Sequence, residues 1–446
     1  MTPNLPDRKA PKIYFLGIDG LSPRILNDLL REGKLPHFHS LIENGCCGEL
    51  ETMRPTNSAV IWTSIVTGKG KEEHGIDSFI AYRWQNRIIR KTTMKKLMKL
   101  GGRTLVQKMI KNGSINTFPL SGEMIRVKTL FEILSDAGKK VGVINWWHSW
   151  PAEAVNGFVI SDRINYARWQ EKYGGELPPE RLTYPSSLLD TIKSLIMLPQ
   201  EVDVNSYRRF VDISGTDLEE MRTAAYRHHQ LKSELKHLIS LDETVRKIAF
   251  YSLSHFTGLD LFSLYFRGVD IMSHCALQYS EWNRITAVDP EERRKYGKAV
   301  SEYYCYMDAV LGALLKEVSP HTSLIIASDH GFVQEKNGKF GHRRSKPPGV
   351  LILSGSNFKK GKQIAGATIF DLAPTILYLS GLPVARDMKG KALKDYIQED
   401  FINQHPVTSV KSYGKREKKI PISPSPSVDE EIKERLKALG YINEDV

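Results

Sequence analysis

The stretch LIIASDH, residues 324–330, ends in an aspartate and a histidine after a short apolar run. The run is too short and too rich in β-branched residues for a helix, so it predicts a buried strand. Strands of this kind belong to parallel sheets covered on both faces, and ligands bind just beyond their carboxyl ends. Asp329 and His330 therefore stand where functional groups stand in α/β proteins, and they offer two ligands for a divalent metal. A turn aspartate beside a surface histidine is the competing interpretation.

The composition allows a large folded core. The chain has 446 residues, of which 41% are hydrophobic and 26% charged. This is enough for one large α/β domain with insertions, or for two to three ordinary domains. The formal net charge of +12 indicates anionic partners, namely phosphorylated substrates, nucleic acid or an anionic membrane surface, without selecting among them.

The cysteines and the first residues bear on the compartment. Cys46 and Cys47 are adjacent, Cys275 and Cys305 are isolated, and no CxxC pair occurs. We expect free thiols and a reducing compartment. Residues 1–11 are expected to form a loose leader without the apolar region of a signal peptide, so a cytoplasmic location is predicted if Met1 is the true start.

Two further strands are predicted to lead into acidic residues. Residues 12–19, KIYFLGID, form an apolar run that ends in Asp19. Residues 260–266 form another, with Asp270 and His274 shortly after it. An aspartate and a histidine four residues apart lie on one face of a helical turn, a spacing that suits one metal ion. Each of these residues also has an ordinary interpretation as a turn or surface residue.

A hydroxyl group is predicted at the start of a helix. Residues 54–57 read as a turn and residues 58–66 as a helix, with Ser58 in its first turn. The free N–H groups and the positive dipole end at that position favour an anion and lower the cost of an alkoxide. Ser58 could instead be only the N-cap, and Thr56 and Thr63 are rival hydroxyls.

These features are predicted to share one edge of the sheet. His342 lies on a loop broken by glycine and proline, close to the end of the 324–330 strand. The edge would hold three carboxylates, three histidines and one hydroxyl: Asp19, Asp270, Asp329, His274, His330, His342 and Ser58. Two divalent metal ions held by such a set can clamp both the attacking and the leaving oxygen of a displacement at phosphorus.

The fold class predicted is α/β, with a doubly wound, mostly parallel sheet between helices and a helical cap insertion. Residues 1–82, 126–164 and 256–400 are assigned to the core, the last range carrying most metal ligands. Residues 83–125 are a basic insertion and residues 165–255 a helical cap insertion. Residues 292–317 are predicted to form one long helix. Residues 401–446 are read as a linker and a C-terminal amphipathic helix.

Two segments keep alternative interpretations. Residues 83–112 are strongly basic with interleaved apolar residues, which is typical of a solvated cap helix or of an amphipathic helix on an anionic surface. Trp147 follows the strand predicted at residues 141–146, where it could line a substrate pocket or fill the core.

The chain resembles the alkaline phosphatase superfamily, and within it the type I phosphodiesterase/nucleotide pyrophosphatase branch. The motifs that carry the resemblance are GIDG (17–20), PTNSAVIWTSIVTGKGKEEHGI (55–76), GVDIMSH (268–274), ASDHGF (327–332) and GHRRSKPPGVLILSG (341–355). They cover the core nearly from end to end and leave the insertions unmatched. The resemblance implies an alkaline phosphatase-like fold and a hydrolase of phosphoric esters.

The resemblance also implies a role for each residue. Asp19, Ser58, Asp329 and His330 match the site of the metal that activates the nucleophile. Asp270, His274 and His342 match the second metal, which stabilises the leaving oxygen. Both metals would be zinc in this family, and manganese or iron also fits the donor set. Ser58 would form a covalent intermediate that is then hydrolysed.

One position departs from the family pattern. The nucleotide pyrophosphatases carry a threonine nucleophile and, three residues later, an asparagine that contacts phosphate. The corresponding residues here are Ser58 and Ile61. Serine supports the same chemistry, and Asn57 or an arginine of the cap is a candidate for the missing contact. His74 matches a recurrent structural turn and is not counted as a ligand.

The sequence therefore predicts a metal-dependent phosphodiesterase with a phosphorylated small-molecule or nucleotide substrate. A phosphomonoesterase, or a mutase or transferase that passes on the phosphate, is the alternative on the same fold. A non-catalytic protein that binds an anionic ligand is the third. No specific nucleic-acid motif is present, and residues 83–112 are a candidate for peripheral contact with anionic surfaces.

Overall fold

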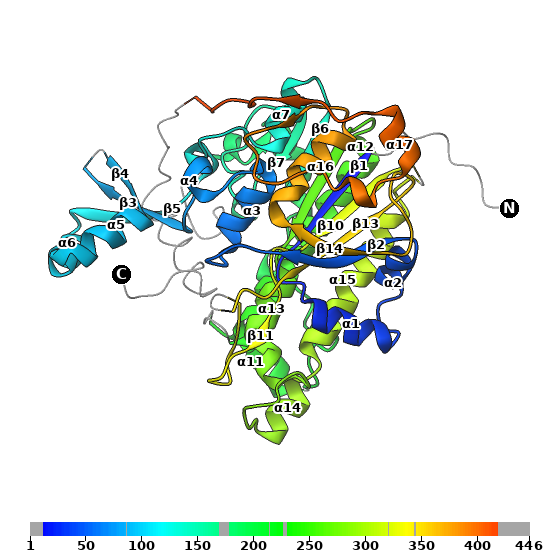
Figure 1. Cartoon of the computed structure of the whole chain (residues 1–446). Helices are drawn as coiled ribbons and strands as arrows, with labels where there is room; N and C mark the ends of the chain where they lie inside the picture. Colours follow the sequence, from blue (N-terminus) through cyan, green and yellow to red (C-terminus); the bar gives the residue numbers. More distant parts are fainter. Residues whose placement is uncertain are drawn as a thin grey trace.

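The computed structural model describes residues 12–85, 87–168, 178–213, 215–225, 230–319, 321–342 and 345–417 (Figure 1). The leader predicted for residues 1–11 and the linker and helix predicted after residue 417 lie outside these ranges. Among the described residues, no helix combines the length and the apolar character that crossing a bilayer requires. All four cysteines are described and free, as predicted.

A nine-stranded sheet forms the centre of the molecule. Its order is β14(Lys362–Thr368), β2(Gly45–Glu51), β13(Gly349–Ser354), β10(Ser323–Ala327), β1(Ile13–Ile18), β9(Leu261–Phe266), β6(Val141–Ile144), β7(Gly157–Ile160) and β8(Thr183–Tyr184). The pairing pattern makes seven of these strands run in one direction, with β13 and β8 reversed. The mostly parallel sheet predicted from the sequence is thus confirmed.

The buried strand β13 runs antiparallel to both of its neighbours, β10 and β2. Among the described residues between β10 and β13 there is no helix, and a parallel neighbour would need a crossover of a dozen residues or more, usually helical. The loop of residues 328–348 therefore leaves and re-enters the sheet at the same edge. This return keeps His342 beside the carboxyl end of β10.

Helices cover both faces of the sheet, as in a doubly wound fold (Figure 1). On one face α1(Pro23–Arg31), α2(Pro36–Glu43), α12(Leu231–His255), α13(Gly268–Ala276) and α15(Ala299–Leu315) pack on one another. On the other face α3(Ser58–Thr67), α7(Leu130–Asp136) and α16(Leu372–Leu379) do so. The strands β1, β9 and β10 between them are buried throughout.

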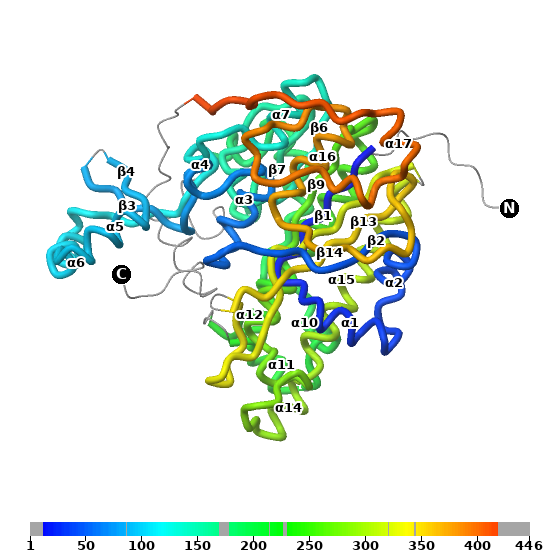
Figure 2. Tube along the Cα trace, in the orientation of Figure 1, coloured from blue at the N-terminus to red at the C-terminus, as the bar shows by residue number. Residues whose placement is uncertain are grey.

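The helix predicted over residues 292–317 is two helices, so that prediction was wrong. α14(Pro290–Tyr296) ends before Gly297, and α15 begins at Ala299. Glycine is a weak helix former, which explains the break. Figure 2 shows α14 beside α11(Thr216–Thr223), in a lobe away from the sheet. An ion pair between Lys295 Nζ and Asp217 Oδ2, at 2.8 Å, joins the two helices.

The helical cap insertion also contributes strand β8 to the edge of the sheet. Beyond the predicted core, residues 401–417 pack on the body of the protein. Within them, β16(Ser409–Val410) pairs with β15(Val384–Ala385). Near the end of this segment, Arg416 forms an ion pair with Glu132, with Nε 2.8 Å from Oε1.

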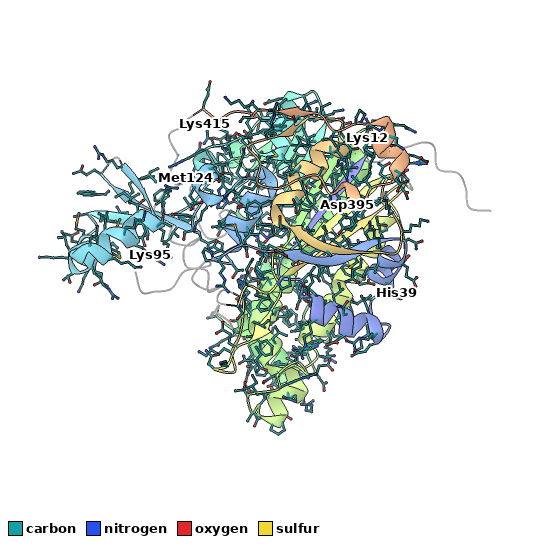
Figure 3. All side chains as sticks on the ribbon, in the orientation of Figure 1. Lys12, His39, Lys95, Met124, Asp395 and Lys415 are labelled. Carbon is teal, nitrogen blue, oxygen red and sulfur yellow. The ribbon has the colours of Figure 1, made fainter. Side chains whose placement is uncertain are left out.

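The basic insertion is not a single helix. It begins with an antiparallel hairpin of β3(Ile80–Trp84) and β4(Arg87–Arg90), and β5(Ile115–Pro119) pairs on the other side of β3. Between β4 and β5 lie α5(Lys91–Leu97) and α6(Arg103–Lys111). Residues 80–119, which we call the basic arm, project from the body (Figure 1), and Figure 3 labels Lys95 on it.

His74 is a buried structural residue, at the end of α4(Lys71–His74). Its Nδ1 accepts a hydrogen bond from the Ile76 N–H at 3.1 Å. Its Nε2 therefore carries the proton and donates to Ser64 Oγ, 3.0 Å away. Burial lowers the pKa of His74 to about 3, so the ring stays neutral in the folded protein at neutral pH.

This lowered pKa predicts a loss of stability in acid. Between pH 6.5 and pH 3 the unfolded chain binds a proton at His74 that the folded chain does not, so stability falls as pH falls. From pH 7 to pH 5, protonation of His74 in the unfolded chain lowers the free energy of unfolding by about 2 kcal/mol. Glutamine does not titrate. Between pH 7 and pH 5, the unfolding free energy of His74→Gln should therefore fall by about 2 kcal/mol less than that of the wild type.

Urea unfolding at pH 7 and pH 5, with metal removed by a chelator, measures the difference. His321→Gln, a change at an exposed histidine, is the control and should keep the wild-type dependence. Equal pH dependence of the His74→Gln variant and the wild type would show that His74 does not contribute in this way.

Candidate active site

The register of the central strands brings the predicted acidic residues together. β1 pairs with β10 on one side and with β9 on the other, both in parallel. Gly17 of β1 lies opposite Ala327 and Tyr265, so the three strands end at the same level. Asp19 and Asp329 follow two of these ends within two residues, and the helix that follows the third strand carries Asp270 in its first turn.

A first group of side chains surrounds Nε2 of His330. Oδ1 of Asp19 lies 3.4 Å from it, Oδ2 of Asp329 3.5 Å, and Oδ1 of Asp270 3.7 Å. Ser58 Oγ lies 3.3 Å from the same nitrogen and donates a hydrogen bond to Asp19 Oδ1 at 3.3 Å. All five residues are fully buried. Atoms of Asp19, Asp270 and His330 are close enough together to hold one metal ion.

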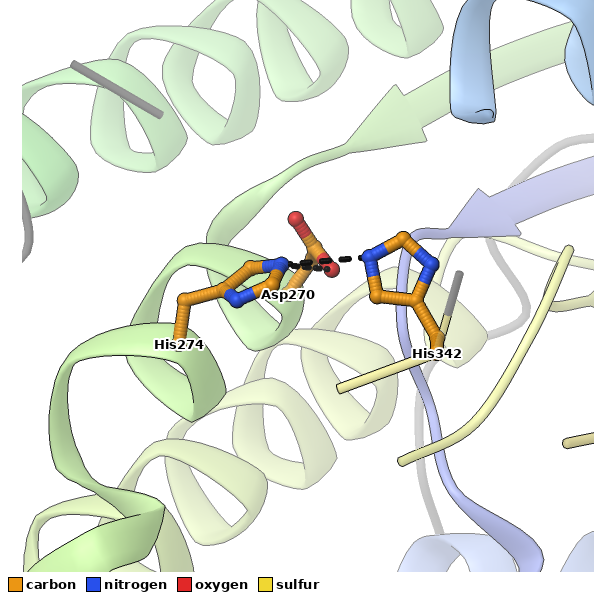
Figure 4. A group of neighbouring side chains, drawn as sticks. All are labelled: Asp270, His274 and His342. Atoms are coloured by element: carbon orange, nitrogen blue, oxygen red, sulfur yellow. Dashed lines mark hydrogen bonds and ion pairs between the residues drawn. The ribbon is translucent and has the colours of Figure 1, made fainter. Parts of the chain in front are cut away.

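A second group shares Asp270 with the first. His274 Nε2 lies 3.5 Å from Asp270 Oδ1 and 3.2 Å from His342 Nε2, and these three residues could also hold an ion. Figure 4 shows both imidazoles directed toward the carboxylate, one from α13 and the other from the returning loop. The rings of His342 and His330 stack with centroids 3.7 Å apart, which links the two groups.

The carboxylates of this site repel one another. Burial raises the pKa of Asp19 well above its usual range, and the negative charges of Asp329 and Asp270 raise it further. Burial also raises the pKa of Asp329 to about 7. Such a cluster is costly to bury as anions unless positive charge compensates it. A divalent cation held here would supply that charge, and the oxygen and imidazole donors would suit zinc, manganese or iron.

The polar residues at the start of α3 have different hydrogen-bond partners. Asn57, not Ser58, is the N-cap of α3, and its Oδ1 accepts from the Val60 N–H at 3.3 Å. The rival hydroxyls are engaged elsewhere: Thr56 Oγ1 donates to the His342 carbonyl at 2.6 Å, and Thr63 Oγ1 donates to a carbonyl of its own helix. Of these three hydroxyl groups, only that of Ser58 forms a hydrogen bond with the acidic cluster.

Tyr265 is a site residue that the sequence reasoning missed. It lies on β9, and its hydroxyl donates a hydrogen bond to Asp19 Oδ2. The Trp147 indole N–H donates to the Tyr265 hydroxyl at 2.7 Å, so Trp147 acts on the site through Tyr265. The guanidinium of Arg267 lies over the Trp147 ring, 4.4 Å from its centroid. A tyrosine near the carboxyl end of an otherwise apolar strand was the available signal.

Ser328 and Gly20 fix the two loops of the first group. Ser328 Oγ accepts from the Leu21 N–H at 2.8 Å and donates to the His330 carbonyl at 2.9 Å. The Gly20 N–H lies 3.3 Å from Asp329 Oδ1 and donates to it. A side chain at Gly20 would lie 2.8 Å from Asp270 Cβ, and its φ of +70° also favours glycine.

A buried cluster of aspartates and histidines at the carboxyl edge of an α/β sheet can hold the metal ions that many hydrolases use. Residues 14–344 match the family described as Type I phosphodiesterase / nucleotide pyrophosphatase. The chain belongs to this family of hydrolases, and its fold is the alkaline phosphatase-like α/β fold.

Individual relatives are distant. Human ectonucleotide pyrophosphatase/phosphodiesterase 5 is 12% identical, with 87% of this chain and 100% of that chain covered and a TM-score of 0.49. A phosphonate monoester hydrolase from Silicibacter pomeroyi is 14% identical, with 86% and 76% covered and a TM-score of 0.45. Human arylsulfatase K is 24% identical over 174 residues, which are 33% of this chain and 32% of that protein. The chain thus matches only about a third of this last relative.

Removing the Tyr265 hydroxyl should weaken metal binding. Tyr265→Phe deprives Asp19 of the hydrogen bond that orients it, and losing such a support typically costs about 10–100-fold in metal affinity. Zinc titration against a competing chelator measures the change.

Tyr14→Phe is the matched control for this experiment. Tyr14 lies on the adjacent strand β1, and its buried hydroxyl has no hydrogen-bond partner among the described residues. This variant should bind zinc as the wild type does. If Tyr265→Phe and Tyr14→Phe bind zinc equally well, the hydroxyl does not support the site.

Proposed function

We propose that this chain is a metal-dependent phosphodiesterase in which Ser58 is the nucleophile at a two-metal site. The observation that supports the proposal is the position of Ser58 Oγ, buried and 3.3 Å from both Asp19 Oδ1 and His330 Nε2. The family membership supports the substrate class, a phosphoric ester of a small molecule or nucleotide.

Two groups of residues would hold the metal ions. Asp19, Ser58, Asp329 and His330 would hold one ion, and Asp270, His274 and His342 the other. Asp270 also borders the first group, so it belongs to both. When bound there, two divalent cations, most simply zinc, lower the pKa of the nucleophile and stabilise negative charge on the leaving oxygen.

The residues of the chain support a displacement with a covalent intermediate. The Ser58 hydroxyl already donates to Asp19 Oδ1, so its proton can pass to that carboxylate as Oγ attacks phosphorus. A new bond forms between Oγ and phosphorus, the bond from phosphorus to the leaving oxygen breaks, and the proton taken up by Asp19 passes by way of solvent to the leaving alkoxide. Water then attacks the esterified phosphoserine: its hydroxide goes to phosphorus, the bond between phosphorus and Oγ breaks, and its proton goes to Ser58 Oγ.

The start of α3 assists this step. Ser58 is the first residue of the helix, where the positive end of the helix dipole favours an oxyanion and a bound phosphate group. Asn57 keeps the helix start fixed by capping it. The nucleophile is thus held by a capped helix rather than by a mobile loop.

Phosphomonoester hydrolysis or phosphate transfer is the second candidate function. Ile61 occupies the position where the resembled enzymes carry an asparagine that contacts phosphate. Its side chain is apolar and fully buried, so it makes no such contact. Comparing a diester with a monoester, with and without an added alcohol as acceptor, distinguishes these activities.

Ser58→Ala should keep its metal and lose turnover. Without Oγ no covalent intermediate can form, and hydrolysis of bis-nitrophenyl phosphate should fall by about 10³-fold or more. Elemental analysis and the rate are measured on the same sample. Ser64→Ala removes a hydroxyl from the same helix that bonds His74 instead of the cluster, and should stay within a few-fold of wild type. Wild-type turnover of the Ser58→Ala variant would rule out this nucleophile.

The shared carboxylate gives a test of the two-metal site. Wild-type protein should contain about two metal ions per chain. His342→Ala and His330→Ala should each lose about one of them, whereas Asp270→Asn should weaken both because Asp270 belongs to both groups. His255→Ala, at an exposed histidine, is the control and should keep both. A single equivalent in the wild type, lost alike in every site variant, would contradict the proposal.

A further inference from the structure

The basic arm concentrates positive charge. Residues 83–112 hold ten arginines and lysines and no acidic residue, whereas the whole chain has 63 basic and 51 acidic residues. This short segment thus carries ten of the twelve net positive charges. The basic residues are Arg83, Arg87, Arg90, Lys91, Lys95, Lys96, Lys99, Arg103, Lys108 and Lys111. Nothing in the proposed chemistry uses them.

The arm is a folded unit with a core of its own. Tyr82, Met94, Val106 and Ile115 are buried together between its small sheet and its two helices. The charges are therefore carried on a defined surface. Leu97, Leu100 and Leu105 are not among the residues that form this core or pack against it.

Apolar residues are nevertheless exposed on the arm. Leu97, Leu100 and Leu105 are 44%, 85% and 62% exposed. With Trp84, they make up four of the six large hydrophobic residues that are exposed in the described part of the chain. Exposed apolar residues gathered in this way mark a binding surface.

The leucines gather at the turn between the two helices. Leu97 ends α5, and Leu105 lies in the first turn of α6. Leu100 lies in the turn itself, next to Gly101 with a φ of +95°. Lys95, Lys96, Lys99 and Arg103 lie between or next to the leucines along the chain and are also exposed. We call residues 95–105 the arm tip.

We propose that the arm tip docks on an anionic phospholipid surface, with the leucines entering the headgroup boundary and the lysines contacting the lipid phosphates. Exposed leucines interleaved with exposed basic residues are complementary to such a surface, where apolar burial and charge attraction act together. The long lysine side chains can keep their charges at the headgroups while the leucines go deeper.

Nucleic acid fits this surface less well. A phosphate backbone would attract the lysines and arginines but would leave the three leucines in water. Single-stranded binding sites add aromatic side chains on which bases stack, and Trp84 is the one exposed large aromatic residue among those described. The leucines therefore favour the lipid surface.

Vesicle sedimentation of the full chain tests the proposal. The protein should bind vesicles of phosphatidylcholine mixed with phosphatidylserine, should bind phosphatidylcholine alone far more weakly, and should be released by salt. The variant Leu100→Ser/Leu105→Ser and the variant K95Q/K96Q/K99Q should each bind the anionic vesicles about tenfold or more weakly.

Two control variants match these changes away from the arm. Ile285→Ser removes an exposed aliphatic residue that is 58% exposed. K360Q/K391Q/K394Q removes three exposed lysines. Both should bind vesicles like the wild type, and the thermal unfolding of every variant checks that it is folded. None of these readouts depends on catalytic activity.

Three outcomes would overturn the proposal. The first is failure of the wild-type protein to bind anionic vesicles. The second is binding that the lysine variant loses but the leucine variant keeps, since charge alone would then act. The third is tighter binding to single-stranded or duplex DNA than to the vesicles at the same salt concentration, unaffected by loss of the leucines.

Discussion

Three buried carboxylates at one edge of the sheet are the constraint on which the site depends. Asp19, Asp270 and Asp329 are brought together by strands that end at the same level, so their repulsion is built into the fold. Hydrogen bonds from Tyr265 and the Gly20 N–H offset part of it. These neutral donors would not cancel the charge of three ionised carboxylates. A cation held at this position would therefore contribute to stability as well as to chemistry.

The central part of this arrangement could be predicted from the sequence. β1 and β10 are apolar runs that lead directly into acidic residues, and the direction of parallel strands assigns those residues to one edge. The spacing of Asp270 and His274 likewise fixed one helical face. His342 was different, because its position depends on a loop that returns to the edge it left. Spacing along the chain does not encode that return, and only the family-like motif GHRRSKPPGVLILSG (341–355) suggested that His342 belongs to the site.

Other features gave a weak or misleading signal. Tyr265 reads as a core residue because it lies in a buried strand, and its hydroxyl gains a role only from the proximity of Asp19. The hairpin of the basic arm turns through Gln85, which adopts a φ of +53° although no glycine marks the turn. Interleaved leucines and lysines then favoured a single helix over residues 83–112. The missed role of Tyr265 and the helix expected over residues 83–112 both arise where tertiary contacts outweigh local preference.

The side chains of the two groups differ in exposure, and this difference indicates the side from which solvent reaches the site. The side chains of Asp19, Asp329 and His330 are completely buried, whereas that of His274 is 17% exposed. Solvent thus meets the site from the side of the second group. A substrate would enter from there with its ester group facing Ser58, and the alcohol would leave by the same route. For the proposed attack by Ser58, an open side opposite the serine would suit an in-line displacement, since the attacking and leaving oxygens lie on opposite sides of phosphorus.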